Sequence, residues 1–213
     1  MEMVLVFDMD GTLIDTDEII YQTWNELFTL FKPKGISVSR EETKNFSGPP
    51  VEQSIAKAFP EADGTFILKE YRNRTTKYYD NFLRLFPGEL EVLNKLHNEG
   101  YKMCIATTKN REMAIKCLEK YKIKDYFDII LTSSDGLKNK PAPDMLNYIS
   151  KKMNIAKENM IMIGDTKFDY HSSKNANVDC ILFNGASRHY EDDIKPFAIV
   201  NTYDELYKVI KNK

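Results

Sequence analysis

The sequence has few of the features that mark specialised classes of protein. Its 213 residues include one tryptophan, three cysteines, eight prolines and nine glycines. This is too little cysteine for a disulfide scaffold and too little proline and glycine for a fibrous or low-complexity chain. The three cysteines, Cys104, Cys117 and Cys180, lie far apart among apolar residues. We therefore expect buried structural thiols in a reducing cytoplasm.

An excess of charge and long apolar runs are also missing. The 30 lysines and arginines nearly balance the 32 acidic residues, giving a formal net charge of -2 that does not favour nucleic-acid binding. No stretch approaches the ~18 apolar residues of a membrane span. The short apolar start has no basic segment before it, so we predict no signal peptide. The expectation is a cytoplasmic monomer or homodimer with neither membrane nor nucleic acid as a partner.

Apolar residues are nevertheless plentiful enough for a core, since 42% of the chain is hydrophobic, including 12 tyrosines and 12 phenylalanines. Residues 3–7 form a continuous apolar run, which predicts a strand buried on both faces. From residue 89 onward, patterns of helix and strand alternate. Strands are predicted at 103–107, 127–131, 159–163, 178–183 and 198–200, and helices at 89–99, 111–121, 143–153, 168–175 and 203–211. This alternation predicts an α/β fold with a doubly wound, Rossmann-like parallel sheet.

The region between the first strand and residue 83 has a different pattern. Apolar residues recur at helical spacing over 18–31, and helical patterns follow at 39–46, 51–59 and 64–82. No strand-like run occurs there. We therefore expect a small all-helical domain at 16–82, inserted into a core made of residues 1–15 and 83–213.

Residues able to do chemistry collect after the predicted strands. Ligands of doubly wound sheets bind outside the carboxyl ends of the strands, which makes these positions informative. Asp8 and Asp10 follow the first strand and point the same way in extended chain, and Gly11 then permits a sharp turn. The later strands are followed by Thr107, Thr108 and Lys109, then by Lys138 and Lys140, and then by Asp165 and Asp169.

Crowded carboxylates raise one another's pKa, and a hard divalent cation such as Mg²⁺ removes that conflict. The lysine and threonine side chains at these strand ends supply an amine and a hydroxyl, which suit a phosphoryl group. A carboxylate can also attack phosphorus and form an aspartyl-phosphate. The residues therefore predict Mg²⁺-dependent phosphoryl transfer.

Four motifs in sequence order resemble those of the haloacid dehalogenase superfamily of phosphotransferases. The first is D-x-D-G-T at 8–12, and the second is Thr107 at the end of an apolar strand. The third is Lys140 in a K-P-x-P context, and the fourth is G-D-x-x-x-D at 164–169. The resemblance covers essentially the whole chain, and each motif follows a predicted strand.

The resemblance implies roles for these residues. Asp8 would attack phosphorus, and Asp10 would protonate the leaving oxygen and then activate water. Mg²⁺ would be held by the Asp8 side chain, the Asp10 backbone carbonyl and Asp165. Asp169 would orient Lys140 or waters of the metal, or bind the metal itself.

The resemblance also implies a phosphate site and a cap. The non-reacting phosphate oxygens would be held by Gly11, Thr12, Thr107, Thr108 and Lys140. The helical insert resembles the small cap of members such as phosphoglycolate phosphatases and pyrophosphatases. In that cap, Gly48 and Pro49 would face the substrate while the closed cap excludes water.

The first substrate class indicated is a small phosphorylated metabolite, with phosphoglycolate ahead of pyrophosphate or a 5′-nucleotide. A phosphomutase such as a β-phosphoglucomutase would use the same scaffold. A dehalogenase is disfavoured because Asp10 is present, and a phosphonate-cleaving enzyme would need a cap lysine such as Lys44 or Lys57. A signalling receiver is disfavoured by the insert, and a non-catalytic descendant by the complete set of motif residues.

Overall fold

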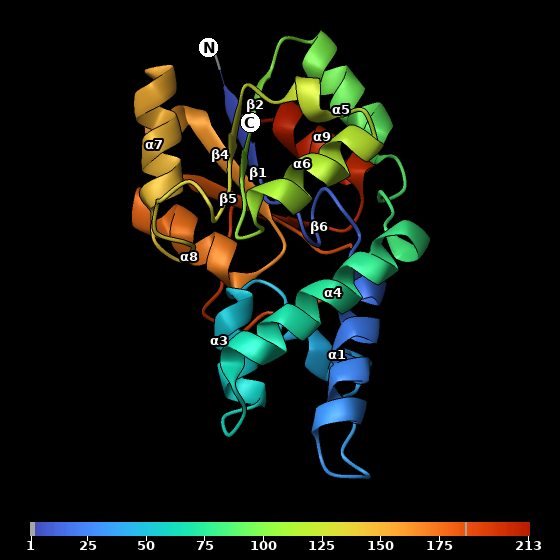
Figure 1. Ribbon diagram of the computed structural model, residues 1–213. Coiled ribbons are helices and arrows are strands. Elements are labelled where there is room, and N and C mark those ends of the chain that lie inside the picture. Colours follow the sequence, from blue (N-terminus) through green and yellow to red (C-terminus); the bar gives the residue numbers. More distant parts are fainter. Residues whose placement is uncertain (1–2, 186) are drawn as a thin grey trace. The chain divides into compact units, whose positions relative to one another are not determined.

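The computed structural model describes residues 3–185 and 187–213 (Figure 1). The chain divides into two compact units. One unit contains the residues up to 14 together with 85–213, and the other contains residues 15–84. Each unit has its own layout and its own core.

The larger unit is built on a six-stranded sheet with strand order β3-β2-β1-β4-β5-β6. Every neighbouring pair is parallel, which confirms the predicted α/β doubly wound fold. The strands are β1 (Val4–Phe7), β2 (Lys102–Ala106), β3 (Ile129–Leu131), β4 (Met160–Gly164), β5 (Asp179–Phe183) and β6 (Ala198–Val200). Chain order runs from β1 toward one edge and then from β4 toward the other. The topological switch point therefore lies between β1 and β4.

Helices cover both faces of this sheet (Figure 1). They are α5 (Glu89–Asn98), α6 (Arg111–Lys120), α7 (Asp144–Met153), α8 (Lys167–Ala176) and α9 (Tyr203–Lys211), with single turns of 3₁₀ helix at Lys124–Tyr126 and Lys157–Asn159. Val6 packs with Ile149 of α7 on one face, and the ring of Phe7 meets that of Phe127, with centroids 6.1 Å apart, on the opposite face. Because both faces are covered, β1 is apolar without alternation.

Some predicted boundaries are wrong by one or two residues. The third strand shows why: it begins at Ile129 rather than at Phe127. The chain forms a 3₁₀ turn just before it, and the N–H of Phe127 donates to the carbonyl of Lys124 at 3.2 Å. The hydrogen bond of this turn therefore keeps the start of the apolar run out of the strand.

The three cysteines are buried free thiols, as predicted. Among the residues that the structure describes, none of the helices is both long enough and apolar enough to cross a membrane.

The smaller unit is all-helical over residues 15–84. Its helices are α1 (Asp17–Phe31), α2 (Arg40–Lys44), α3 (Val51–Ala58) and α4 (Gly64–Phe82). Its core is aromatic: the Trp24 ring stacks on that of Phe46 at 4.2 Å, and Leu27, Ile55 and Ile67 pack in the same cluster. This unit therefore buries its own apolar faces.

Candidate active site

Several of the predicted site residues meet at the switch point of the sheet. Asp8 directly follows β1, and its N–H donates to the Ile163 carbonyl of β4 at 2.8 Å. Thr107 follows β2 and Asp165 follows β4. Because the strands are parallel and in register, their carboxyl ends bring these side chains to one edge of the sheet.

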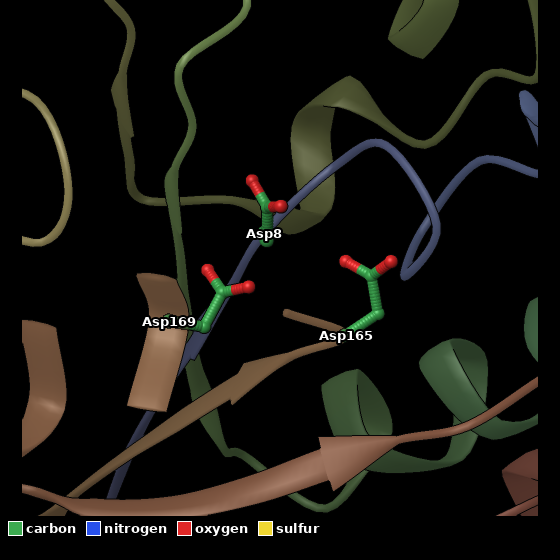
Figure 2. Close-up of side chains that lie close together, drawn as sticks. All are labelled: Asp8, Asp165 and Asp169. Carbon is green, nitrogen blue, oxygen red and sulfur yellow. The ribbon is translucent and has the colours of Figure 1, made fainter. Parts of the chain in front are cut away.

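Three of the four predicted acids form a tight, buried cluster. Asp8, Asp165 and Asp169 each offer a carboxylate oxygen, and these oxygens all lie within 4.8 Å of one another. Figure 2 shows the three side chains around the turn that follows β1. Such a cluster of like charges needs counter-charges near it.

Lys140 supplies one of these counter-charges. Its Nζ lies 2.8 Å from Asp8 Oδ1 and 2.5 Å from Asp169 Oδ1, and its side chain is only 3% exposed. Asp169 Oδ2 accepts hydrogen bonds from the N–H and the hydroxyl of Thr166, at 3.0 and 2.7 Å. Both oxygens of Asp169 are thus engaged by the protein. Of the two roles predicted for Asp169, this arrangement favours the orientation of Lys140 over the binding of a metal.

Burial sets the ionisation of these groups. It raises the pKa of Asp8 to about 6, an effect that Lys140 opposes and Asp169 reinforces. Burial also raises the pKa of Asp165 to about 7. The nearby guanidinium of Arg188 opposes this rise, and the repulsion from Asp169 adds to it. Burial acts to lower the pKa of Lys140, but the carboxylates of Asp169 and Asp8 together raise it above its ordinary value.

These shifts predict how the stability of the metal-free protein depends on pH. The pKa values of Asp8 and Asp165 are about 6 and about 7 in the folded chain, against 3.8 for an ordinary aspartate. At pH values between the ordinary pKa of 3.8 and these raised values, the folded state therefore binds more protons than the unfolded state. The stability from this source is fully present below the unfolded pKa and is lost as the pH rises through 6 and 7.

We expect the melting temperature in EDTA to fall between about pH 5 and pH 8, and Mg²⁺ to reduce the fall because a bound cation favours ionised carboxylates. Glu89, a buried carboxyl group outside the site, acts in the same direction because burial raises its pKa. Glu89→Gln should remove the contribution of Glu89 to the fall in melting temperature, while Mg²⁺ should still reduce the fall that remains. A melting temperature in EDTA that rises with pH would contradict this prediction.

Gly11 and Thr12 lie in the turn that follows β1. The N–H of Gly11 donates to the Ile14 carbonyl at 2.8 Å, and that of Thr12 to the Met9 carbonyl at 3.1 Å. These two amides are engaged in the turn itself. That Gly11 and Thr12 hold phosphate stays a prediction. The Gly11 backbone has a φ of +80°, and an added Cβ would lie 2.0 Å from Asp165 Oδ2. Glycine is needed here for the close approach of Asp165.

The hydroxyl residues sit close to the acids. The Thr12 hydroxyl lies 3.5 Å from Asp165 Oδ1, and the Thr12 carbonyl accepts a hydrogen bond from the Tyr203 hydroxyl at 2.6 Å. Thr107 is buried, and its Oγ1 accepts the N–H of Lys109 at 3.2 Å. Thr108 is half-buried in the same turn.

Asp10 is paired with Lys109, a residue for which the sequence analysis predicts no role. The Nζ of Lys109 lies 2.6 and 2.8 Å from the two carboxylate oxygens of Asp10. The side chain of Lys109 is 9% exposed and that of Asp10 is 26% exposed. The position of Lys109 just after the second strand was the available signal, because strand-end residues share the site.

Arg188 is the other functional candidate that the sequence patterns missed. It lies in the loop after β5, and its Nε donates to Asp165 Oδ2. The loop has no periodic pattern and no motif, so only its place after a strand could have drawn attention to it.

Gly48 and Pro49 lie in the helical unit, between α2 and α3. Gly48 has a φ of +102° and turns the chain between these helices. That these residues face a substrate stays a prediction.

The chemistry of the cluster fits Mg²⁺. The donors that face one another are carboxylate oxygens, the ligands that a hard cation prefers. Four carboxylates, Asp8, Asp10, Asp165 and Asp169, face three cationic side chains, Lys109, Lys140 and Arg188. The residual negative charge can be offset by a divalent cation, which in turn leaves positive charge for an anionic phosphoryl group.

Comparisons with known proteins agree with this arrangement. Residues 5–183 match the family model described as haloacid dehalogenase-like hydrolase. The pyrophosphatase PpaX of Halalkalibacterium halodurans is 32% identical over 193 residues, which is 91% of this chain and 88% of that protein. PpaX of Listeria monocytogenes is 30% identical over 172 residues, covering 81% of this chain and 78% of that protein.

Solved structures share the fold. A haloacid dehalogenase-like hydrolase from Streptococcus pneumoniae superimposes with a TM-score of 0.84 at 24% identity, covering 98% of each chain. A predicted phosphoglycolate phosphatase from Haemophilus somnus gives a TM-score of 0.81 at 20% identity, again covering 98% of each chain. Together with the family match over residues 5–183, these findings show that the chain is an enzyme of the haloacid dehalogenase-like hydrolase family.

Proposed function

We propose that the chain is a Mg²⁺-dependent phosphatase that works through a phosphoryl group carried on Asp8. The observation that carries the proposal is the environment of Asp8: a buried carboxylate 2.8 Å from Lys140 and grouped with Asp165 at the switch point of the sheet. A nucleophilic carboxylate must approach an anionic phosphoryl group, and positive charge beside it removes the repulsion.

Asp8 and Asp10 divide the chemistry. An oxygen of Asp8 would form a bond to phosphorus while the bond to the leaving oxygen breaks, and protonated Asp10 would give that oxygen its proton. Water would then attack phosphorus, lose its proton to Asp10 and break the bond to Asp8, which releases phosphate. Lys109, bonded to both oxygens of Asp10, would hold that carboxyl group in position.

The remaining residues would bind and orient. Lys140 and the Thr107 hydroxyl would contact the phosphoryl oxygens, and Asp169 would keep Lys140 in place. Mg²⁺ would be held by Asp8, Asp165 and the backbone carbonyl of Asp10, where it would offset negative charge on the phosphoryl group.

The helical unit, residues 15–84, would serve as the cap of this enzyme. A cap that closes over the site would exclude water and contact the leaving group. We propose that Gly48 and Pro49 take part in that contact, since Gly48 has no side chain to keep a substrate away from the backbone.

Pyrophosphate is our first candidate for the substrate, and phosphoglycolate is the second. Pyrophosphate moves ahead because relatives at 30% and 32% identity, which this chain covers over most of their length, are named pyrophosphatases. Both substrates are small phosphoryl compounds whose leaving group carries negative charge, and Lys109 beside Asp10 suits such a group.

The test is phosphate release from a panel of compounds with Mg²⁺ and with EDTA. The panel contains pyrophosphate, phosphoglycolate, nucleoside monophosphates, sugar phosphates and an aryl phosphate. We expect Mg²⁺-dependent release, greatest for pyrophosphate. Release that is equally fast in EDTA would overturn the proposed metal dependence, and no release from any compound would overturn the proposed activity.

A further inference from the structure

Arg188 forms a buried ion pair with one of the proposed metal ligands. Its Nε donates to Asp165 Oδ2. The side chain of Arg188 is 7% exposed and that of Asp165 is 0% exposed. Since solvent screens such a pair little, the guanidinium is the dominant positive charge at Asp165 in the structure.

Arg188 and the residues that follow it are held in place by contacts of their own. The N–H of Arg188 donates to Asn184 Oδ1 at 2.6 Å. Two residues further on, the hydroxyl of Tyr190 donates to the backbone carbonyl of Asp165 at 3.1 Å. Tyr190 also packs against an apolar cluster that includes Ile194. The loop thus contacts Asp165 twice, once at its carboxylate and once at its backbone.

A cation that binds Asp165 must either bind beside this guanidinium or displace it. If Arg188 keeps its place, it repels the cation across a short distance in a buried site. If Arg188 leaves, a buried and hydrogen-bonded ion pair is broken. Either course costs free energy, so the cation binds more weakly than it would to the carboxylates without Arg188.

We propose that Arg188 is a built-in counter-ion of Asp165 that competes with Mg²⁺ and sets the Mg²⁺ affinity of the site. The proposal rests on the proposed function, because it requires Asp165 to be a metal ligand. Arg188 occupies the carboxylate while the site is empty, which keeps the buried acids compensated. It also weakens Mg²⁺ binding, so that the site responds to changes in the Mg²⁺ concentration.

The test measures Mg²⁺ binding without substrate, by isothermal titration calorimetry, in the wild-type protein and in Arg188→Gln. We expect Arg188→Gln to bind Mg²⁺ about 10- to 100-fold more tightly, the range expected when a hydrogen bond to a charged group no longer competes. Its melting temperature in EDTA should be lower than that of the wild type, and added Mg²⁺ should raise it by more. Tyr190→Phe is the matched control, since it removes the neighbouring hydrogen bond to Asp165 without changing charge; its affinity should stay within about threefold of the wild type.

Unchanged or weaker Mg²⁺ binding by Arg188→Gln would overturn the inference. If this variant does not fold in EDTA, Asn184→Ala decides, because it keeps Arg188 but removes the hydrogen bond that anchors its backbone beside Asp165: tighter binding than the wild type supports the competition, and equal or weaker binding overturns it. A wild-type protein that binds no Mg²⁺ would overturn the proposed metal site, and the inference with it. Binding by the wild type that Arg188→Gln fails to tighten would leave the proposed function standing and remove only the role of Arg188.

Discussion

Asp8→Asn is expected to lower kcat by about 10⁴-fold or more, because it replaces the group that attacks phosphorus with an amide that is a poor nucleophile. The fold should survive this change. Burial raises the pKa of Asp8 to about 6, so the ionised carboxylate destabilises the folded state at neutral pH, and its removal also relieves repulsion from Asp169. Lys140 keeps Asp169 as its partner at 2.5 Å.

The measurement is steady-state kinetics beside a thermal melt followed by circular dichroism. We expect the loss of turnover to be accompanied by a melting temperature equal to or above that of the wild type. Asp125→Asn, at an exposed aspartate far along the chain, is the matched control and should change neither quantity. If Asp8→Asn retains turnover within tenfold of the wild type, Asp8 is not the nucleophile.

Lys140→Met has the second large expected effect, and this effect is on stability as well as on activity. The change leaves Asp8 and Asp169 buried without the ammonium that lies 2.8 and 2.5 Å from them. Removing one partner of a buried ion pair typically costs about 3–5 kcal/mol, which lowers the melting temperature by about 10 °C in a chain of this size.

The pH dependence of this loss identifies its cause. Near pH 5 Asp8 is protonated, since burial raises its pKa to about 6, so one of the two uncompensated charges disappears and the loss should shrink. Lys138→Met is the control, because Lys138 lies two residues away and is exposed. Equal melting temperatures for Lys140→Met and Lys138→Met at about pH 8 would show that Lys140 does not hold the acidic cluster together.

The sequence predicts the sheet and the core of the site because both follow from local and additive features. A buried parallel strand is recognisable from a run such as residues 4–7. The rule that ligands bind at strand ends then brings Asp8, Thr107 and Asp165 together without any knowledge of side-chain contacts. The family resemblance added the order of the motifs and their roles.

The parts that could not be predicted depend on contacts between segments far apart in the chain. Lys109 and Asp10 are 99 residues apart, and their pairing depends on side-chain directions that no pattern encodes. Arg188 lies in an aperiodic loop, and its meeting with Asp165 depends on how that loop folds back. The sharp turn at Gly11 was predicted, but the close approach of Asp165 to this glycine depends on a contact between residues far apart in the chain.

The most direct test of the proposed function is to look for a phosphoryl group on Asp8. Asp10→Asn lacks the group that activates water, so in the presence of Mg²⁺ and pyrophosphate or phosphoglycolate the phospho-enzyme should accumulate. Rapid acid quenching, proteolysis and mass spectrometry should find the peptide that contains residues 4–12 heavier by one phosphoryl group, and the same peptide unmodified in the double variant Asp8→Asn with Asp10→Asn. Hydrolysis that proceeds with no modified peptide, or a modification on another residue, would contradict a mechanism through Asp8.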